Sequence, residues 1–227
     1  MRTMASKFSD RRHVCSLFAN VSDGKPVRSN LQELIRILRA LCPSSSSEKT
    51  LSEYQVALKH SSRSASGMQL WCNLEKESKS RTFQMSNEFH MLKFSRPLAQ
   101  HDHSCFVRSY DSATVGDNFG NLMRLLGFKF DYEYIASGIV FQLQPSLEVR
   151  IYQAFKLAEG GYRNLDEQKD NKIVQGQLVW GNSRWWVVEI RAVCHDPKNL
   201  QNTEKAVENL ASSLQAYGDF YANVQRS

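Results

Sequence analysis

The sequence predicts a mainly β (α+β) protein: a single antiparallel β-barrel or strongly curved sheet with about three flanking amphipathic helices. Three observations lead to this prediction. Most apolar residues alternate with polar ones at a period of two, which is typical of strands. Short polar turns join these segments, whereas parallel strands need crossovers of about 12 residues. Three further segments repeat their apolar residues at helical spacing.

In the first half of the chain, one helix is predicted among several strands. The first strand covers 13–21 and ends at a turn over 22–26, which contains glycine and proline. A helix is predicted next, because apolar residues share one face, and it stops at Cys42-Pro43. These residues are Leu31, Leu34, Ile35, Leu38 and Leu41. Alternation then predicts strands at 54–58, at 68–74, within 83–94 and from 106 to 110.

The second half repeats this mixture. A second helix is predicted with Gly127 at its C-terminal end and an apolar face made of Val115, Phe119, Leu122, Met123 and Leu126. Strands follow at 128–134, 138–143 and 147–157, then a loop at 160–171 and a hairpin formed by 174–180 and 185–193. The last helix starts near Asn202, and its apolar side comprises Ala206, Val207, Leu210, Leu214, Tyr217 and Tyr221.

No internal linker interrupts these elements, so we expect one domain over 13–227. A basic N-terminal arm, 1–12, precedes it, and the sequence leaves open whether this arm is ordered. The arm contains Arg2, Lys7, Arg11 and Arg12, which supply much of the net charge of +6. Such an arm favours solubility or loose attraction to an acidic surface. Because no nucleic-acid-reading motif accompanies it, we expect no sequence-specific nucleic-acid binding.

Composition excludes several classes of protein. The chain has 227 residues and a mean hydropathy of -0.47, and no stretch approaches the ~18 consecutive apolar residues of a membrane helix. Its first residues lack the apolar segment of a signal peptide, so we expect neither a secreted nor a membrane-spanning protein. The five cysteines are odd in number and scattered without a C-x-x-C pair, which favours small core residues in a reducing compartment over disulfides or a zinc site.

One string suggests enzymatic chemistry. Glu75-x-Glu77-x-Lys79 points two carboxylates and an ammonium to one side of a strand, as a divalent cation on a polyphosphate would require. It resembles the motif of triphosphate-tunnel phosphohydrolases, which are also antiparallel barrels, and Asp131 with Glu133 offers a second acidic pair. A solvated hairpin turn explains the same string.

Other candidate sites have simpler interpretations. His101-Asp102-His103 is the one local cluster with ligand-like chemistry, and its neighbours indicate a solvated turn. We interpret His195 as a cap or turn residue, because a catalytic histidine would need a nucleophile beside it and the sequence offers none. No nucleophile elbow, Walker loop or dinucleotide fingerprint is present. We therefore assign no catalytic residue, metal or cofactor.

An ordered set of residues along the chain identifies a family. The set lies in the central segment and comprises Val107, Arg108, Gly127, Phe128, Asp131, Glu133, Gly138 and Phe141. It resembles the central segment of the Mediator subunit 18 family, whose members belong to the head module of the RNA polymerase II coactivator. The flanking strands and helices, including the amphipathic C-terminal helix, occur in the same order in that family.

The resemblance implies a nuclear, non-enzymatic scaffold that supports regulated RNA polymerase II transcription. Members of the family form an antiparallel barrel that pairs with Mediator subunit 20 and captures a helix from the C-terminal end of Mediator subunit 8. The pair forms a movable part of the head that approaches polymerase and initiation factors. Four aromatic residues are candidate interface anchors, and a core role for them stays open: Trp180, Tyr217, Phe220 and Tyr221.

Overall fold

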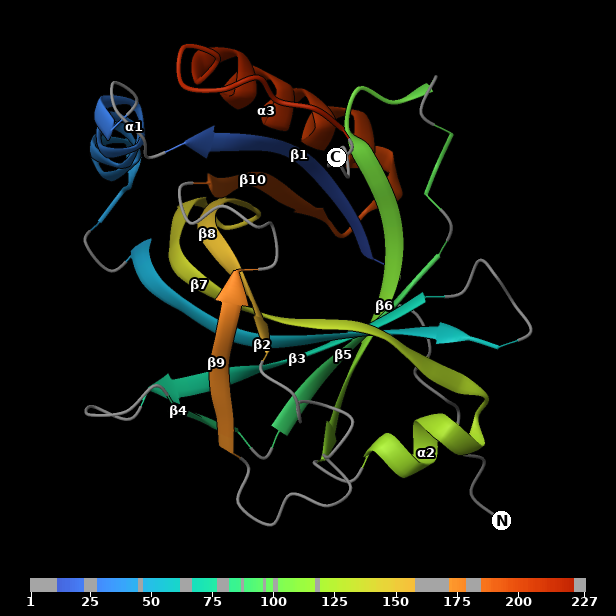
Figure 1. Cartoon of the computed structure of the whole chain (residues 1–227). Coiled ribbons are helices and arrows are strands. Elements are labelled where there is room, and N and C mark those ends of the chain that lie inside the picture. Colours follow the sequence, from blue (N-terminus) through green and yellow to red (C-terminus); the bar gives the residue numbers. More distant parts are fainter. Residues whose placement is uncertain are drawn as a thin grey trace.

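Ten strands in one antiparallel sheet dominate the described part of the chain (Figure 1). The computed structural model describes residues 12–22, 28–44, 47–61, 67–76, 82–86, 88–95, 97–99, 102–116, 119–157, 172–178 and 185–222. The strands are β1 (Arg12–Ser22), β2 (Glu48–His60), β3 (Gly67–Lys76), β4 (Thr82–Met85), β5 (Glu88–Phe94), β6 (Phe106–Gly116), β7 (Phe128–Gln144), β8 (Leu147–Leu157), β9 (Lys172–Leu178) and β10 (Trp185–Cys194). The helices are α1 (Arg28–Leu41), α2 (Phe119–Leu125) and α3 (Leu200–Ser213), with a short 3-10 turn, η4 (Pro197–Asn199), before α3.

Eight of these strands close into a barrel. Their order is β10-β1-β6-β5-β3-β2-β7-β8, and β8 pairs again with β10 through Val187 to Ala192. The two remaining strands, β9 and β4, bridge the far end of β8 to the far end of β3. The predicted antiparallel barrel is therefore confirmed. Strands β9 and β4 also close a second ring of strands, which shares β3, β2, β7 and β8 with the barrel.

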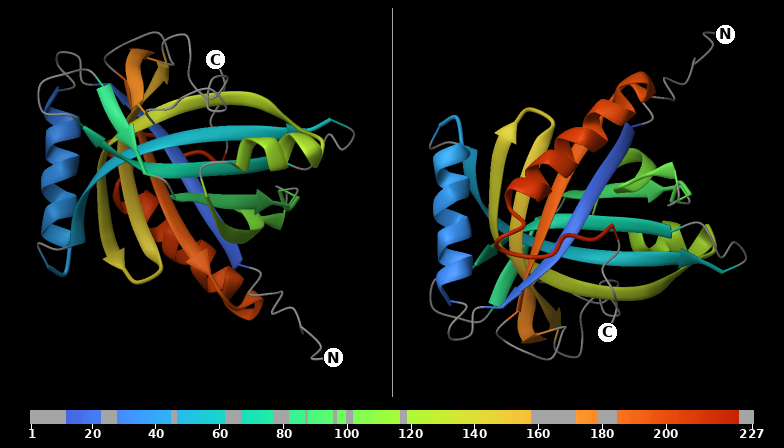
Figure 2. Two further views of the ribbon diagram at one scale, coloured as in Figure 1. Left: turned by 90° about the horizontal axis from the view of Figure 1, so that it is seen from below. Right: turned by 90° about the horizontal axis from the view of Figure 1, so that it is seen from above.

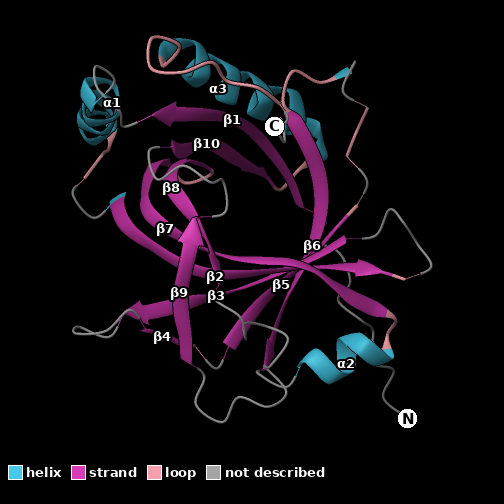
Figure 3. Ribbon diagram, viewed as in Figure 1, coloured by secondary structure: helices cyan, strands magenta, loops and turns pink. Residues whose placement is uncertain are grey.

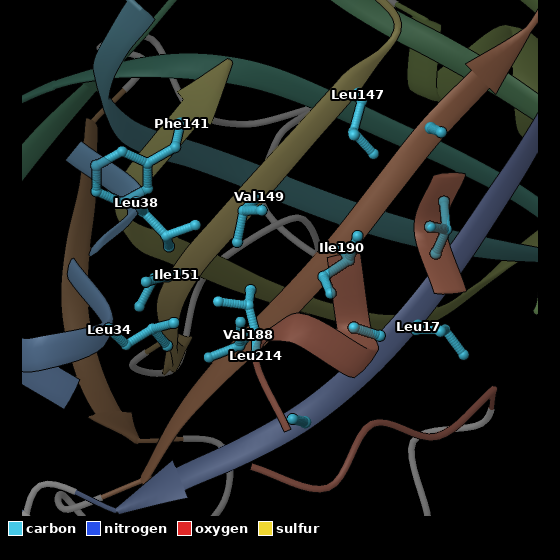
Figure 4. Packing of buried hydrophobic residues seen from close by; sticks show 14 of the residues in the cluster. Leu17, Leu34, Leu38, Phe141, Leu147, Val149, Ile151, Val188, Ile190 and Leu214 are labelled. Atoms are coloured by element: carbon cyan, nitrogen blue, oxygen red, sulfur yellow. The ribbon is translucent and has the colours of Figure 1, made fainter. Parts of the chain in front are cut away.

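Alternating residues of the barrel strands pack outward against two helices. Figures 2 and 3 show α1 and α3 lying on the outside of the barrel wall. The core between the wall and these helices includes fully buried Leu34 and Leu38 of α1, Leu214 after α3, and Val188 and Ile190 of β10 (Figure 4). Burying such side chains contributes about 1.5–3 kcal/mol each, so this outer core stabilises the barrel from outside.

A second apolar core lies against the ring of strands that β4 and β9 close. Tyr54 and Val56 of β2, Leu70 of β3, Phe89 of β5 and Ile135 of β7 are almost completely buried there. Met123 attaches the short helix α2 to this cluster. These two cores lie on the outer face of the barrel wall, and its inner face carries polar side chains such as Glu53 and Arg150 beside apolar ones such as Leu51 and Leu92.

Several predicted boundaries are corrected by tertiary pairing. Strands 128–134 and 138–143 are one 17-residue strand, because β7 pairs with β2 from Phe128 to Phe141, with a bulge at Asp131 and no break at 135–137. The segment 83–94 divides into β4 and β5, which pair with opposite ends of β3. Val115 belongs to β6, and α2 starts at Phe119.

The C-terminal helix is shorter than predicted. It begins at Leu200 and ends at Ser213, so Tyr217 and Tyr221 lie beyond it. Tyr221 instead forms an isolated β-bridge with Phe18 through two backbone hydrogen bonds of 2.8 Å. Residues 1–11, the loop 160–171 and the turn 181–184 lie outside the described residues. None of the described helices is long and apolar enough to cross a membrane.

Candidate functional site

A buried ion pair spans β7 on the inner side of the barrel wall. Nη2 of Arg150 on β8 lies 2.7 Å from both carboxylate oxygens of Glu53 on β2. Gln55 donates to the same carboxylate at 2.8 Å, and the Tyr134 hydroxyl donates to Gln55 at 2.6 Å. Because buried charges are expensive unless paired and hydrogen-bonded, this network is what allows the barrel interior to hold charge.

Arg150 and two buried tyrosines keep fixed protonation states. Burial by itself lowers the pKa of Arg150, but the carboxylates of Glu53, Glu189 and Glu148 raise it above its ordinary value. Burial also raises the pKa of Tyr134 and of Tyr152. Arg150 therefore stays charged and both phenols stay neutral at physiological pH.

A polar cavity opens beside this network. Its volume is about 830 Å³, and all eight strands of the barrel contribute to its walls. Its charged lining residues are Arg12, Lys49, Glu53, Glu148, Arg150 and Arg191. A cavity of this size inside an eight-stranded barrel is large enough for one small ligand.

The acidic residues singled out by the sequence do not line this cavity. Glu75 is exposed on β3, and Glu77 and Lys79 lie outside the described residues. Asp131 forms an exposed ion pair with Lys59 at 2.8 Å, and Glu133 accepts a hydrogen bond from Tyr54 at 2.6 Å. Asp131 and Glu133 therefore do not supply a second acidic pair to the interior, which corrects that expectation. Within the part of the chain that is described, no three His, Cys, Asp or Glu side chains gather as a metal site.

An exposed apolar surface lies on α2 and the turn that follows it. Leu125 is 86% exposed, and Leu122 and Leu126 are 50% and 52% exposed. We call these three residues the α2 leucine patch. Clustered exposed leucines are typical of surfaces that contact another molecule. Sequence analysis missed this patch because it placed Leu122 and Leu126 on a buried helix face.

The four predicted interface anchors have different environments. Tyr217 and Phe220 pack against the outer core, which agrees with the core role left open for them. Tyr221 is 53% exposed beside Phe18. Trp180 lies outside the described residues.

Several family-motif residues have structural roles in the barrel. Val107 and Phe141 are buried in the outer core, and the guanidinium of Arg108 lies over the rings of Phe94 and Phe106, 5.4 and 4.9 Å from their centroids. Gly127 ends the α2 turn with a φ of 81°, a conformation that glycine adopts without strain. These positions act through packing and backbone geometry.

Gly138 permits a close approach of two strands. A Cβ at this position would lie 1.9 Å from the carbonyl oxygen of Ile151 and 2.7 Å from Cα of Tyr152. Only a residue without a side chain therefore fits between β2 and β8 at this point of β7.

One comparison with known proteins shows the family, and another shows the fold. The family model described as "Med18 protein" matches residues 5–220. Among solved structures, a chain of the Schizosaccharomyces pombe Mediator head module is 18% identical, with a TM-score of 0.65, and the match covers 92% of this chain and 98% of that one. No curated protein matches the sequence.

The same fold occurs in more distant proteins. A protein from Pyrococcus horikoshii matches with a TM-score of 0.54 and 11% identity over 92% of this chain and 94% of that chain. The Mimivirus capping enzyme triphosphatase matches with a TM-score of 0.51 and 7% identity over 91% and 90% of the two chains. At this identity the similarity establishes a shared barrel architecture and no shared activity.

Proposed function

Because the chain belongs to the Med18 protein family, we propose that it is a non-enzymatic scaffold in the Mediator head that pairs with Mediator subunit 20 and holds the C-terminal helix of subunit 8. A place in this coactivator implies that it works in the nucleus. The family match over residues 5–220 is the observation that carries the proposal.

The α2 leucine patch supports a scaffold role. Contact with water is unfavourable for apolar side chains as exposed as Leu125. A partner surface that covers them therefore lowers the free energy. An amphipathic helix or the face of a second barrel subunit supplies matching apolar residues. We propose that one of the two partners covers this patch.

The interior supports a role without catalysis. Glu53 is held by Arg150 and Gln55, so this carboxylate is engaged in structural contacts. The triphosphatase alternative rests on Glu75, Glu77 and Lys79. Glu75 is exposed and does not line the cavity, and the other two lie outside the described residues. We expect no Mg²⁺- or Mn²⁺-dependent hydrolysis of tripolyphosphate, and activity that is lost on Glu75→Ala would support the enzyme instead.

Co-expression with the two partners tests the proposal. The full chain, subunit 20 and the C-terminal segment of subunit 8 should co-elute as one complex from a size-exclusion column. The double variant Leu122→Asp/Leu125→Asp should lose one partner. Leu41→Asp is the matched control, because Leu41 on α1 is as exposed as Leu122 but lies apart from the patch. Failure of the unmodified chain to bind either partner would overturn the proposal.

A further inference from the structure

The barrel cavity is built from side chains that converge from every strand of the closed ring. It occupies about 830 Å³ and opens to solvent. Polar side chains outnumber apolar ones such as Leu51, Leu92 and Val140 in its lining, and the neutral hydrogen-bonding groups include Asn73, Ser112, Thr114 and Gln142. A cavity with this lining favours a polar ligand over an apolar one.

Basic side chains outnumber acidic ones around the cavity. Arg12, Lys49, Arg150 and Arg191 face Glu53 and Glu148. The charge of Arg150 is taken up by the Glu53 carboxylate, 2.7 Å away. Glu148 is then the one remaining carboxylate beside the other three basic residues, so the lining keeps a net positive charge.

Those three residues approach the cavity from different strands. Arg12 starts β1, Lys49 lies near the start of β2, and Arg191 lies on β10. Neither Arg12 nor Lys49 forms an ion pair with any described residue. Their arrangement surrounds one volume from several sides, which concentrates a positive potential within it.

Arg191 has an unused donor. Its Nη1 lies 4.0 Å from the Glu148 carboxylate, at the outer limit of an ion pair. Its Nε is buried and has no hydrogen-bond partner among the described residues. A buried donor without an acceptor costs free energy, so an acceptor oxygen that enters the cavity would stabilise this side chain.

We infer that the barrel cavity binds a small anion that carries phosphoryl groups. Phosphoryl oxygens accept several charge-assisted hydrogen bonds at once, which suits the guanidinium groups of Arg12 and Arg191 and the ammonium of Lys49. A neutral or cationic ligand would leave the excess positive charge uncompensated. The inference concerns binding alone and includes no bond cleavage.

Two aromatic rings belong to the cavity wall. The rings of Trp71 and His90 stack with centroids 4.2 Å apart, and both residues line the cavity. A nucleotide and an inorganic polyphosphate share the phosphoryl chemistry, and only the nucleotide has a base that can stack on such rings. Binding inside the barrel is separate from partner docking at the α2 leucine patch, so either proposal can fail alone.

Isothermal titration calorimetry on the purified full chain tests the inference, with sodium tripolyphosphate and ATP as the two probes. Lys49→Gln and Arg191→Met should each weaken tripolyphosphate binding by about tenfold or more, since each removes one charged contact. Lys93→Gln is the matched control, because Lys93 is an exposed lysine on β5 that does not line the cavity. It should bind as the unmodified chain does.

Two outcomes would overturn the inference. One is the absence of saturable binding of either probe at millimolar concentration and low salt. The other is an equal loss for Lys49→Gln and Lys93→Gln, which would indicate general surface attraction. If Arg191→Met does not fold, Arg12→Gln replaces it, because Arg12 is half-buried at the start of β1. Tighter binding of ATP than of tripolyphosphate would identify a nucleotide as the ligand class.

Discussion

Removing the charge of Glu53 should destabilise the protein more than any surface change of similar chemistry. The side chains of Glu53 and Arg150 are only 12% and 10% exposed. Glu53→Gln leaves a buried guanidinium without its main counter-charge, and breaking such a pair costs about 3–5 kcal/mol. Because Glu148 and Glu189 also act on Arg150, we expect a value near the lower end, about 3 kcal/mol.

Urea denaturation followed by circular dichroism measures this loss. The midpoint should fall while the slope stays unchanged, which is the behaviour of a change in stability alone. Thermal unfolding should move downward by about 6–12 °C, since about 2–4 °C corresponds to 1 kcal/mol in a chain of this size. The double variant Glu53→Met/Arg150→Met should recover most of the loss, because neither charge is then left unpaired.

Asp131→Asn is the control for this experiment. It breaks the Lys59–Asp131 pair, whose side chains are largely exposed, and exposed pairs contribute at most about 1 kcal/mol. Equal losses for Glu53→Gln and Asp131→Asn would refute the reasoning, since burial would then not distinguish the two pairs. The same holds if the double methionine variant is no more stable than Glu53→Gln.

Further predictions concern glycines and cysteines. Gly138→Ala should cost at least about 2 kcal/mol in urea denaturation, because the added Cβ meets the backbone of β8, whereas Gly67→Ala, with nothing within 4 Å of its Cβ, should be neutral or slightly stabilising. Equal midpoints for the two would contradict the close approach. Burial raises the pKa of the Cys72 and Cys105 thiols to about 12, so a thiol reagent at pH 8 should modify half-buried Cys42 first and reach the other four cysteines only after denaturation. Rapid reaction of all five in the native protein would contradict this burial.

Much of the barrel could be predicted because alternation is a local property. Each strand has apolar residues on one face, and short turns exclude parallel pairing. The extent of β7 could not be predicted, since Gly138 looks locally like a break between strands. Its actual role depends on the Ile151 carbonyl of another strand. Such a close approach between segments distant in sequence leaves no local pattern.

The polar interior could not be predicted for a related reason. Alternation separates the two faces of a strand but does not say which face meets solvent. Glu53 and Gln55 are polar residues at alternating positions of β2, and such a pattern is equally compatible with a solvent-exposed face. In the structure, helices α1 and α3 cover much of the apolar outer face, and these polar residues turn into the barrel.

The exposure of α2 was also beyond the sequence. The helical spacing of Leu122, Met123 and Leu126 indicates one buried face, whereas α2 is seven residues long and buries Met123 while both leucines stay exposed. Exposure here depends on the position of the helix at the edge of the second core. The functional prediction came from the ordered family motif, because the motif identifies the family without requiring that the binding surface be known.

Affinity purification of the tagged chain from nuclear extract, with quantitative mass spectrometry, is the most direct test of the Mediator assignment. We expect other Mediator head subunits to co-elute in near-equal amounts, and we expect Leu122→Asp/Leu125→Asp to reduce at least one of them while Leu41→Asp does not. Recovery of the chain alone, at its endogenous concentration, would contradict its assignment as a scaffold of the Mediator head.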